Sequence, residues 1–245
     1  MAEPPVVSAA NIEDWDRNAA AYVAQSSDFD NPIYQQFQTV LWECLGDLRG
    51  REVLDVGCGH GWLSHAFQQA GARVLGIDGS AALLNYARAT FLGVDFVQHD
   101  LATGLPPIDR SFDRVVASMV LMDLPELGPL LAAIRRVLRP DGRLIATLTH
   151  PCFFNYPRRN DPVTGRPGRL VSGYLRPRVW RVDTFGGHNH YHRSLTDYVE
   201  ALRAAGLVLT RLYEPAHRLN PDAADAEDWA TIPVFLLIEA APFPH

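Results

Sequence analysis

A turn with glycines at three alternating positions constrains the fold of this chain more than any other feature. It lies within Val53–Phe67, whose sequence is Val-Leu-Asp-Val-Gly-Cys-Gly-His-Gly-Trp-Leu-Ser-His-Ala-Phe. The apolar residues around Asp55 predict a buried strand, and the residues after Gly61 predict an amphipathic helix. The glycines at 57, 59 and 61 expose bare backbone, against which a ligand can lie directly. A carboxylate beside this turn favours a ligand with a cationic amino-acid part over a pyrophosphate.

Strand and helix patterns alternate on both sides of this turn. Strands are predicted at 52–56, 73–77, 94–98, 112–118, 143–149, 207–213 and 232–239. Helices are predicted at 12–25, 32–45, 62–70, 80–91, 125–138 and 194–205. Such alternation predicts βαβ units, and therefore an α/β fold with a doubly wound, mostly parallel sheet.

The chain length of 245 residues has room for one medium α/β domain with an insertion. We expect a single domain in four parts: an N-terminal helical cap (1–48), a sheet core (49–150), an inserted lid (151–193) and a last helix with C-terminal strands (194–245). Residues 151–193, which we call the lid segment, interrupt the alternation with five prolines and many aromatic residues. A long irregular stretch inside a compact domain is usually functional.

The lid segment carries eight arginines and two aspartates, whereas the whole chain has a net charge of −6. Its arginines either bind an anionic acceptor or dock the segment on the acidic remainder of the chain. Its aromatic residues either line a pocket or form a small core within the segment. They are Tyr156, Tyr174, Trp180 and Phe185.

Composition excludes several classes of protein. The acidic net charge argues against a general nucleic-acid binder. No apolar run is long enough for a transmembrane helix and no signal-peptide pattern begins the chain, so we expect a cytoplasmic protein without a membrane partner. All 22 basic residues are arginine, which excludes chemistry that needs a lysine Schiff base. Cys44, Cys58 and Cys152 are widely spaced, show no metal-ligand spacing and are expected to be reduced.

Three carboxylates follow successive predicted strands, namely Asp55, Asp78 and Asp100. Because the carboxyl ends of parallel strands meet at one edge, these side chains are expected to share one rim of the sheet. Asp78 is placed to bind two ribose hydroxyls, and Asp100 or the next backbone N–H is placed to meet an adenine edge. Bulky Trp62 disfavours a dinucleotide fold, which needs a small residue there.

These motifs closely resemble those of bacterial class I S-adenosylmethionine (SAM)-dependent methyltransferases of the small-molecule type. The resemblance covers about residues 50–150 and rests on Val53–Gly61, Gly76–Ser80, Gln98–Leu101, Phe112–Val116 and Leu138–Gly142. It implies a Rossmann-like, seven-stranded sheet with an antiparallel last strand. It also implies SAM as cofactor of the core and S-adenosylhomocysteine as product.

The resemblance also assigns cofactor contacts. It places the methionine end of SAM at Asp55 and the glycine turn, the ribose at Asp78, the adenine at Asp100, and the sulfonium above Ser118. The full set implied is Tyr22, Asp55, Gly57, Cys58, Gly59, Gly61, Asp78, Gly79, Asp100, Leu101, Ser118 and Met119.

Methyl transfer depends mainly on proximity, but a hydroxyl or amine acceptor can need a general base. Candidate bases are His150, at the end of the fifth strand, and His190 and His192, before the last helix. Alternatively, His192 and Arg193 cap that helix and pin the lid segment. Residues 188, 190 and 192 share one face of an extended chain, which allows a metal site. No carboxylate pattern accompanies these histidines, and we expect no metal.

The sequence therefore predicts an enzyme that methylates an oxygen or nitrogen of a small molecule in specialised metabolism, with oxygen favoured. Two alternatives stay open: methylation of a modified tRNA base, and a SAM-binding protein with a non-methylating role. We expect a small-molecule substrate as partner, a monomer or homodimer, and no nucleic acid.

Overall fold

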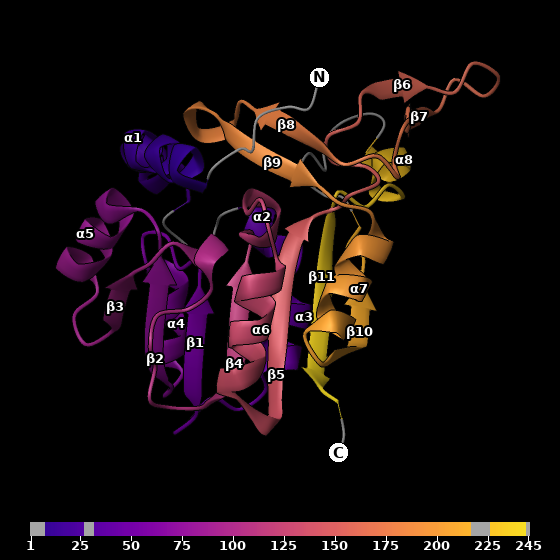
Figure 1. Cartoon of the computed structure of the whole chain (residues 1–245). Coiled ribbons are helices and arrows are strands. Elements are labelled where there is room, and N and C mark those ends of the chain that lie inside the picture. Colours follow the sequence, from indigo (N-terminus) through magenta and orange to yellow (C-terminus); the bar gives the residue numbers. More distant parts are fainter. Residues whose placement is uncertain (1–7, 27–31, 217–225, 244–245) are drawn as a thin grey trace.

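A seven-stranded sheet forms the centre of the molecule, as the computed structural model in Figure 1 shows. The structure describes residues 8–26, 32–216 and 226–243. The strand order is β10-β11-β5-β4-β1-β2-β3. β11 runs antiparallel to both of its neighbours, β5 and β10, while the other pairs are parallel. The predicted doubly wound α/β fold with an antiparallel last strand is confirmed.

The strands lie close to their predicted positions. Their bounds are β1 (Glu52–Val56), β2 (Arg73–Asp78), β3 (Asp95–Gln98), β4 (Phe112–Ser118), β5 (Leu138–Thr149), β10 (Leu207–Tyr213) and β11 (Phe235–Pro242). The largest difference is in β5, which begins five residues earlier than predicted. Leu138 pairs with Phe112 of β4, so the chain leaves the helix and enters the sheet at once.

Apolar side chains on the two faces of the sheet form two buried clusters. In β1, Val53 contributes to one cluster and its neighbour Leu54 to the other, because successive side chains of a strand point to opposite faces. The Val53 cluster contains residues of α3 (Gln38–Leu45), α4 (Trp62–Gln69) and α5 (Ala81–Thr90). The Leu54 cluster contains residues of α6 (Gly128–Val137) and α7 (Leu195–Ala204). Helices therefore cover both faces, as a doubly wound sheet requires.

The N-terminal helices differ from their prediction at two points. α1 (Ser8–Ser26) begins four residues earlier than expected. The predicted helix at 32–45 is broken into α2 (Pro32–Gln35) and α3, with Phe37 between them. Phe37 has a φ of −126°, which is outside the helical range, and its side chain is 2% exposed. The helix is therefore interrupted at a residue whose ring is buried in the core.

The lid segment folds into two short antiparallel hairpins and lies beyond the carboxyl ends of β1, β4 and β5 (Figure 1). One hairpin pairs β6 (Arg158–Asn160) with β7 (Pro167–Arg169), and the other pairs β8 (Arg178–Val182) with β9 (His188–His192). An ion pair between Asp14 and Arg181 joins α1 to the second hairpin. Short helical turns complete the described elements: η1 (Leu101–Thr103), η2 (Leu121–Asp123), η3 (Thr184–Gly186) and α8 (Ala226–Ala230). Among the described helices, none has the length and apolar character needed to cross a membrane.

Candidate active site

A cavity of about 1130 Å³, open to solvent at its mouth, lies where the strands of the sheet end. Its walls come from the carboxyl ends of the strands, from α1 and from the β8–β9 hairpin. The predicted cofactor residues that line it are Tyr22, Gly57, Gly59, Asp78, Gly79, Asp100, Leu101, Ser118 and Met119.

The three glycines of the turn serve different purposes. All have positive φ, at +73° for Gly57, +55° for Gly59 and +85° for Gly61. A Cβ on Gly57 would lie 2.5 Å from a methyl group of Val120, and one on Gly61 would lie 2.7 Å from the ring of Phe96. Gly61 lies outside the cavity lining, so packing rather than ligand approach requires it.

Asp78 connects the glycine turn to the next helix. Its Oδ2 accepts a hydrogen bond of 2.8 Å from the backbone N–H of Gly59, and its Oδ1 accepts one of 2.8 Å from that of Ser80. Burial raises the pKa of Asp78, and these hydrogen bonds oppose the rise. The carboxylate thus both lines the cavity and holds the turn in place.

Asp55 and Cys58 lie beneath the turn and outside the cavity lining, in contrast to their predicted contact with the cofactor. Asp55 is 1% exposed and accepts a hydrogen bond of 2.5 Å from the hydroxyl of Ser64 in α4. Burial raises the pKa of Asp55 to about 7. The Cys58 thiol is also buried, and burial raises its pKa well above the ordinary value. Both side chains support the turn from the core side.

The rim of the cavity continues through the ends of β3 and β4. Asp100 accepts a hydrogen bond from the hydroxyl of Ser8 and caps η1 through the backbone N–H of Ala102. Ser118 shares a hydrogen bond of 3.0 Å with the hydroxyl of Thr147. Met119 has a φ of +57°, a left-handed conformation that is uncommon for a residue other than glycine. Such strain is typical of residues at functional sites.

The structure brings one of the three predicted catalytic histidines into the cavity lining, namely His190. His150 lies outside it, with its Nε2 2.7 Å from Glu214 and its Nδ1 accepting a hydrogen bond from the backbone N–H of Cys152. Burial lowers the pKa of His150. His192 also lies outside and donates from Nε2 to the carbonyl oxygen of Tyr174 at 2.7 Å. His192 therefore joins two parts of the lid segment, whereas α7 is capped by Ser194 and not by His192 and Arg193 as the alternative interpretation also held.

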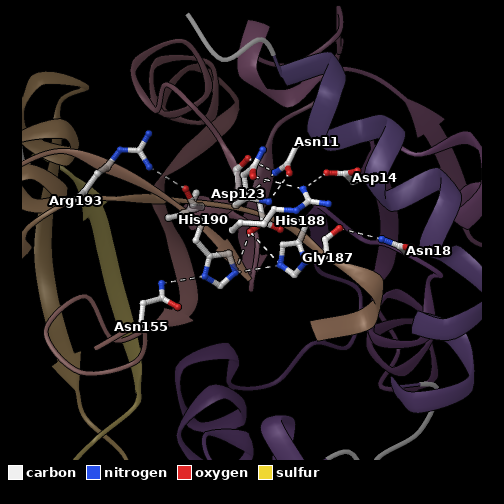
Figure 2. A network of polar contacts seen from close by, with 12 residues as sticks. Asn11, Asp14, Asn18, Asp123, Asn155, Gly187, His188, His190 and Arg193 are labelled. Carbon is white, nitrogen blue, oxygen red and sulfur yellow. Dashed lines mark hydrogen bonds and ion pairs between the residues drawn. The ribbon is translucent and has the colours of Figure 1, made fainter. Parts of the chain in front are cut away.

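Two cavity residues absent from the predicted site, Asp123 and His188, lie beside His190 (Figure 2). His188 Nε2 is 3.1 Å from His190 Nε2, and Asp123 Oδ1 is 3.5 Å from His190 Nε2. Burial lowers the pKa of His188 to about 4 and that of His190 to about 3, and it raises the pKa of Asp123 well above the usual range. We call these three residues the Asp-His cluster. The spacing of the histidines indicated a shared face, but nothing in the sequence linked them to Asp123.

The arginines of the lid segment face away from the cavity. None of the described residues lining it is an arginine. Arg181 pairs with Asp14, and Arg169 donates to the carbonyl oxygen of Tyr156. The aromatic residues divide between the two expected roles: Phe185 lines the cavity, whereas Tyr156 packs edge-on against Trp180.

Known proteins resemble this chain in sequence and in fold. The family described as a methyltransferase domain matches residues 53–142. The demethylmenaquinone methyltransferase of Tropheryma whipplei is 35% identical over 186 residues, which cover 73% of this chain and 74% of that protein. The protein of the same name from Renibacterium salmoninarum is 35% identical over 137 residues, 54% of this chain and 57% of its own length.

A solved structure agrees with these relatives. The SAM-dependent methyltransferase of Mesorhizobium loti is 25% identical, covers 84% of this chain with 97% of its own and has a TM-score of 0.72. The residues that the family matches include the glycine turn, Asp55, Asp78 and Asp100. The chain belongs to the family of S-adenosylmethionine-dependent methyltransferases.

Proposed function

We propose that this methyltransferase transfers the methyl group of SAM to an oxygen of a compact small molecule, in the biosynthesis of a specialised metabolite. The observation that carries the proposal is the composition of the cavity. Gly57, Gly59, Asp78 and Asp100 line one part of it, and the Asp-His cluster lines another. A cofactor and an acceptor can therefore share one cavity.

In this proposal the rim residues hold SAM. Asp78 binds the ribose hydroxyls, and Asp100 with Leu101 flanks the adenine. Tyr22 and the backbone of Gly57 and Gly59 contact the methionine end, next to Gly79. Ser118 and Met119 lie under the sulfonium. All of these residues line the cavity, whereas Asp55, Cys58 and Gly61 act on the cofactor through the shape of the turn.

The acceptor then occupies the space between Met119 and the Asp-His cluster. Aromatic side chains of Trp15, Phe154 and Phe185 line the cavity and favour a flat or apolar acceptor. The polar atoms of the Asp-His cluster face an acceptor hydroxyl. Methyl transfer is an in-line displacement in which the acceptor oxygen forms its bond to carbon as the sulfur–carbon bond breaks, so orientation supplies much of the rate.

Two observations favour a small hydroxylated acceptor over a nucleic acid. The cavity lining contains no arginine among its described residues, so it offers no guanidinium group to a phosphate. A relative from Alkalilimnicola ehrlichii is named ubiquinone biosynthesis O-methyltransferase, and this name specifies methyl transfer to an oxygen. We therefore place tRNA methylation second and a non-methylating role third.

The test is a transfer assay with SAM that carries a ¹³C-labelled methyl group. The purified protein is incubated with hydroxylated aromatic compounds, with matched amines and with unmodified and modified tRNA. We expect a labelled O-methyl product, identified by its carbon chemical shift. Label on nitrogen or on tRNA alone, or no transfer by a protein that binds SAM, would contradict the proposal.

A further inference from the structure

We propose that the Asp-His cluster is a binding site for a divalent transition-metal ion of the zinc type. Asp123 lies at the end of η2, and His188 and His190 lie on β9, so the fold joins residues distant in sequence (Figure 2). Two imidazoles and one carboxylate form a ligand set that zinc and iron(II) use in enzymes. This site differs from the expectation of no metal, which rested on the absence of a carboxylate near the histidines in sequence.

The geometry of the three ligand atoms fits such an ion. His188 Nε2 and His190 Nε2 are 3.1 Å apart, and Asp123 Oδ1 is 3.5 Å from His190 Nε2 and 3.9 Å from His188 Nε2. A point equidistant from three atoms with these separations lies about 2 Å from each, which matches zinc–nitrogen and zinc–oxygen bonds of about 2.0–2.2 Å.

Without a cation, the cluster leaves a buried acceptor unsatisfied. All three side chains are buried, and Asp123 Oδ1 has no hydrogen-bond partner within the described chain. One histidine can donate to the other through the two Nε2 atoms, but that bond leaves the carboxylate oxygen without a partner. A buried acceptor in this state carries the full cost of its desolvation. A divalent cation removes this cost, because it accepts electron pairs from all three atoms at once.

The surroundings hold the ligands in place from outside. The amide nitrogen of Asn155 lies 3.4 Å from His190 Nδ1; with the amide turned by 180°, its oxygen accepts the ring N–H and leaves Nε2 free for a metal. Asn11 donates to the carbonyl oxygen of Asp123 at 2.8 Å and accepts from the backbone N–H of Asn189 at 2.8 Å. This side chain therefore fastens η2 to β9, the two elements that supply the ligands.

A site with three protein ligands has open coordination positions, as catalytic metal sites do. The cluster lines the same cavity as Met119, so an open position can take the acceptor oxygen. This role rests on the proposed function. The metal would lower the pKa of the acceptor hydroxyl, whose proton passes to solvent. The oxygen would then form its bond to the methyl carbon, the sulfur–carbon bond would break, and the sulfonium would leave as a neutral thioether.

The test measures metal binding directly. Untagged protein is freed of metal with a chelator and titrated with Co²⁺, followed by visible absorption, and with Zn²⁺, followed by calorimetry. We expect one ion per chain, and an affinity lower by about 100-fold or more in Asp123→Asn and in His190→Ala, since each variant loses one of the three protein ligands. His192→Ala is the matched control, because His192 lies on the same strand outside the cluster and should keep wild-type metal affinity.

SAM affinity, measured on every variant, shows whether the fold is intact. The proposal is overturned if the wild type binds no stoichiometric ion, or if Asp123→Asn and His190→Ala bind it as tightly as the wild type. Methyl transfer that persists in chelator by a protein without bound metal overturns the role of the ion in the reaction and leaves the proposed function standing. Stoichiometric metal binding without any methyl transfer supports the metal site and contradicts the proposed function.

Discussion

At the scale of single residues, Asp78 joins the glycine turn to the cavity that is proposed to hold SAM. Its two oxygens accept backbone hydrogen bonds from Gly59 and Ser80, and the side chain also lines the cavity. Both roles need a carboxylate, since an amide offers a single acceptor oxygen. The position of Asp78 was predictable from sequence because it depends on local order along one strand. Its hydrogen bond to Gly59 was not predictable, because it depends on the distance between the glycine turn and the end of β2 in the folded chain.

We predict that Asp78→Asn lowers SAM affinity by about tenfold or more, because one backbone N–H loses its partner and the ribose loses a charged acceptor. Calorimetric titration of SAM measures this effect. Asp95→Asn is the control, because Asp95 is exposed at the start of β3 and should bind SAM like the wild type. Equal SAM affinity in the wild type and Asp78→Asn would contradict the role of Asp78.

A second residue-scale prediction concerns His60, a buried histidine of the turn that packs edge-on against Tyr22. Burial lowers its pKa to about 4, below the ordinary value of 6.5, so the unfolded chain binds a proton more readily. Stability should therefore fall as the pH drops below about 6.5. His60→Phe keeps the ring contact. Between pH ~7 and pH ~5 its free energy of unfolding should fall by about 2 kcal/mol less than that of the wild type.

Asp55→Asn provides the opposite control. The pKa of Asp55 is raised to about 7, so the folded protein binds its proton more readily than the unfolded chain. This group therefore adds stability as the pH falls from about 7, and the asparagine variant should lose more stability on acidification than the wild type. Urea unfolding at the two pH values measures both variants. Identical pH dependence in the wild type and both variants would refute the assignment.

At the scale of elements, Arg193 joins the connection between β9 and α7 to the residues that follow η2. Arg193 lies between β9 and α7, and donates to the carbonyl oxygens of Leu124 at 2.6 Å and Pro125 at 2.7 Å. The next residue, Ser194, begins α7 with a capping box formed with Asp197. The helix start was predictable because its capping residues are local. The bonds to Leu124 and Pro125 were not, because they depend on tertiary contact.

We predict that Arg193→Lys lowers the rate of methyl transfer by about tenfold while SAM affinity stays unchanged. Two nitrogens of the planar guanidinium donate to four carbonyl oxygens, and an ammonium cannot reproduce this arrangement. The loosened η2 would move Asp123 relative to β9. Steady-state assays with saturating SAM measure the rate. Arg203→Lys, on the exposed face of α7, is the matched control. A wild-type rate for Arg193→Lys, or a loss of SAM affinity, would contradict this account.

At the scale of the whole molecule, the lid segment and α1 complete a site that the sheet alone leaves open. The parallel, doubly wound sheet and the rim carboxylates followed from the alternation along the chain, and the antiparallel last strand followed from the resemblance to methyltransferases. The Asp-His cluster did not, because η2 and β9 meet only when the lid segment folds back over the strand ends. The surroundings of His150 and His192 were not predictable either. Their places in the sequence suggested that they face the cavity, whereas their side chains bond to Glu214 and Tyr174.

The ion pair between Asp14 and Arg181 ties α1 to the second hairpin, and the Arg181 side chain lowers the pKa of Asp14. We predict that Asp14→Asn raises the KM for the acceptor by about threefold to tenfold, since a partly buried pair between two elements is worth on the order of 1 kcal/mol. The maximal rate should change less. Steady-state kinetics with the identified acceptor tests this, and an unchanged KM would show that the pair does not hold the cavity closed.

In the proposed function, one cavity holds SAM at its rim and the acceptor at the Asp-His cluster. The most direct measurement is SAM affinity and methyl transfer on a single preparation of Asp123→Asn. We predict wild-type SAM affinity and a methyl-transfer rate lower by about 100-fold or more. Transfer at the wild-type rate would contradict the claim.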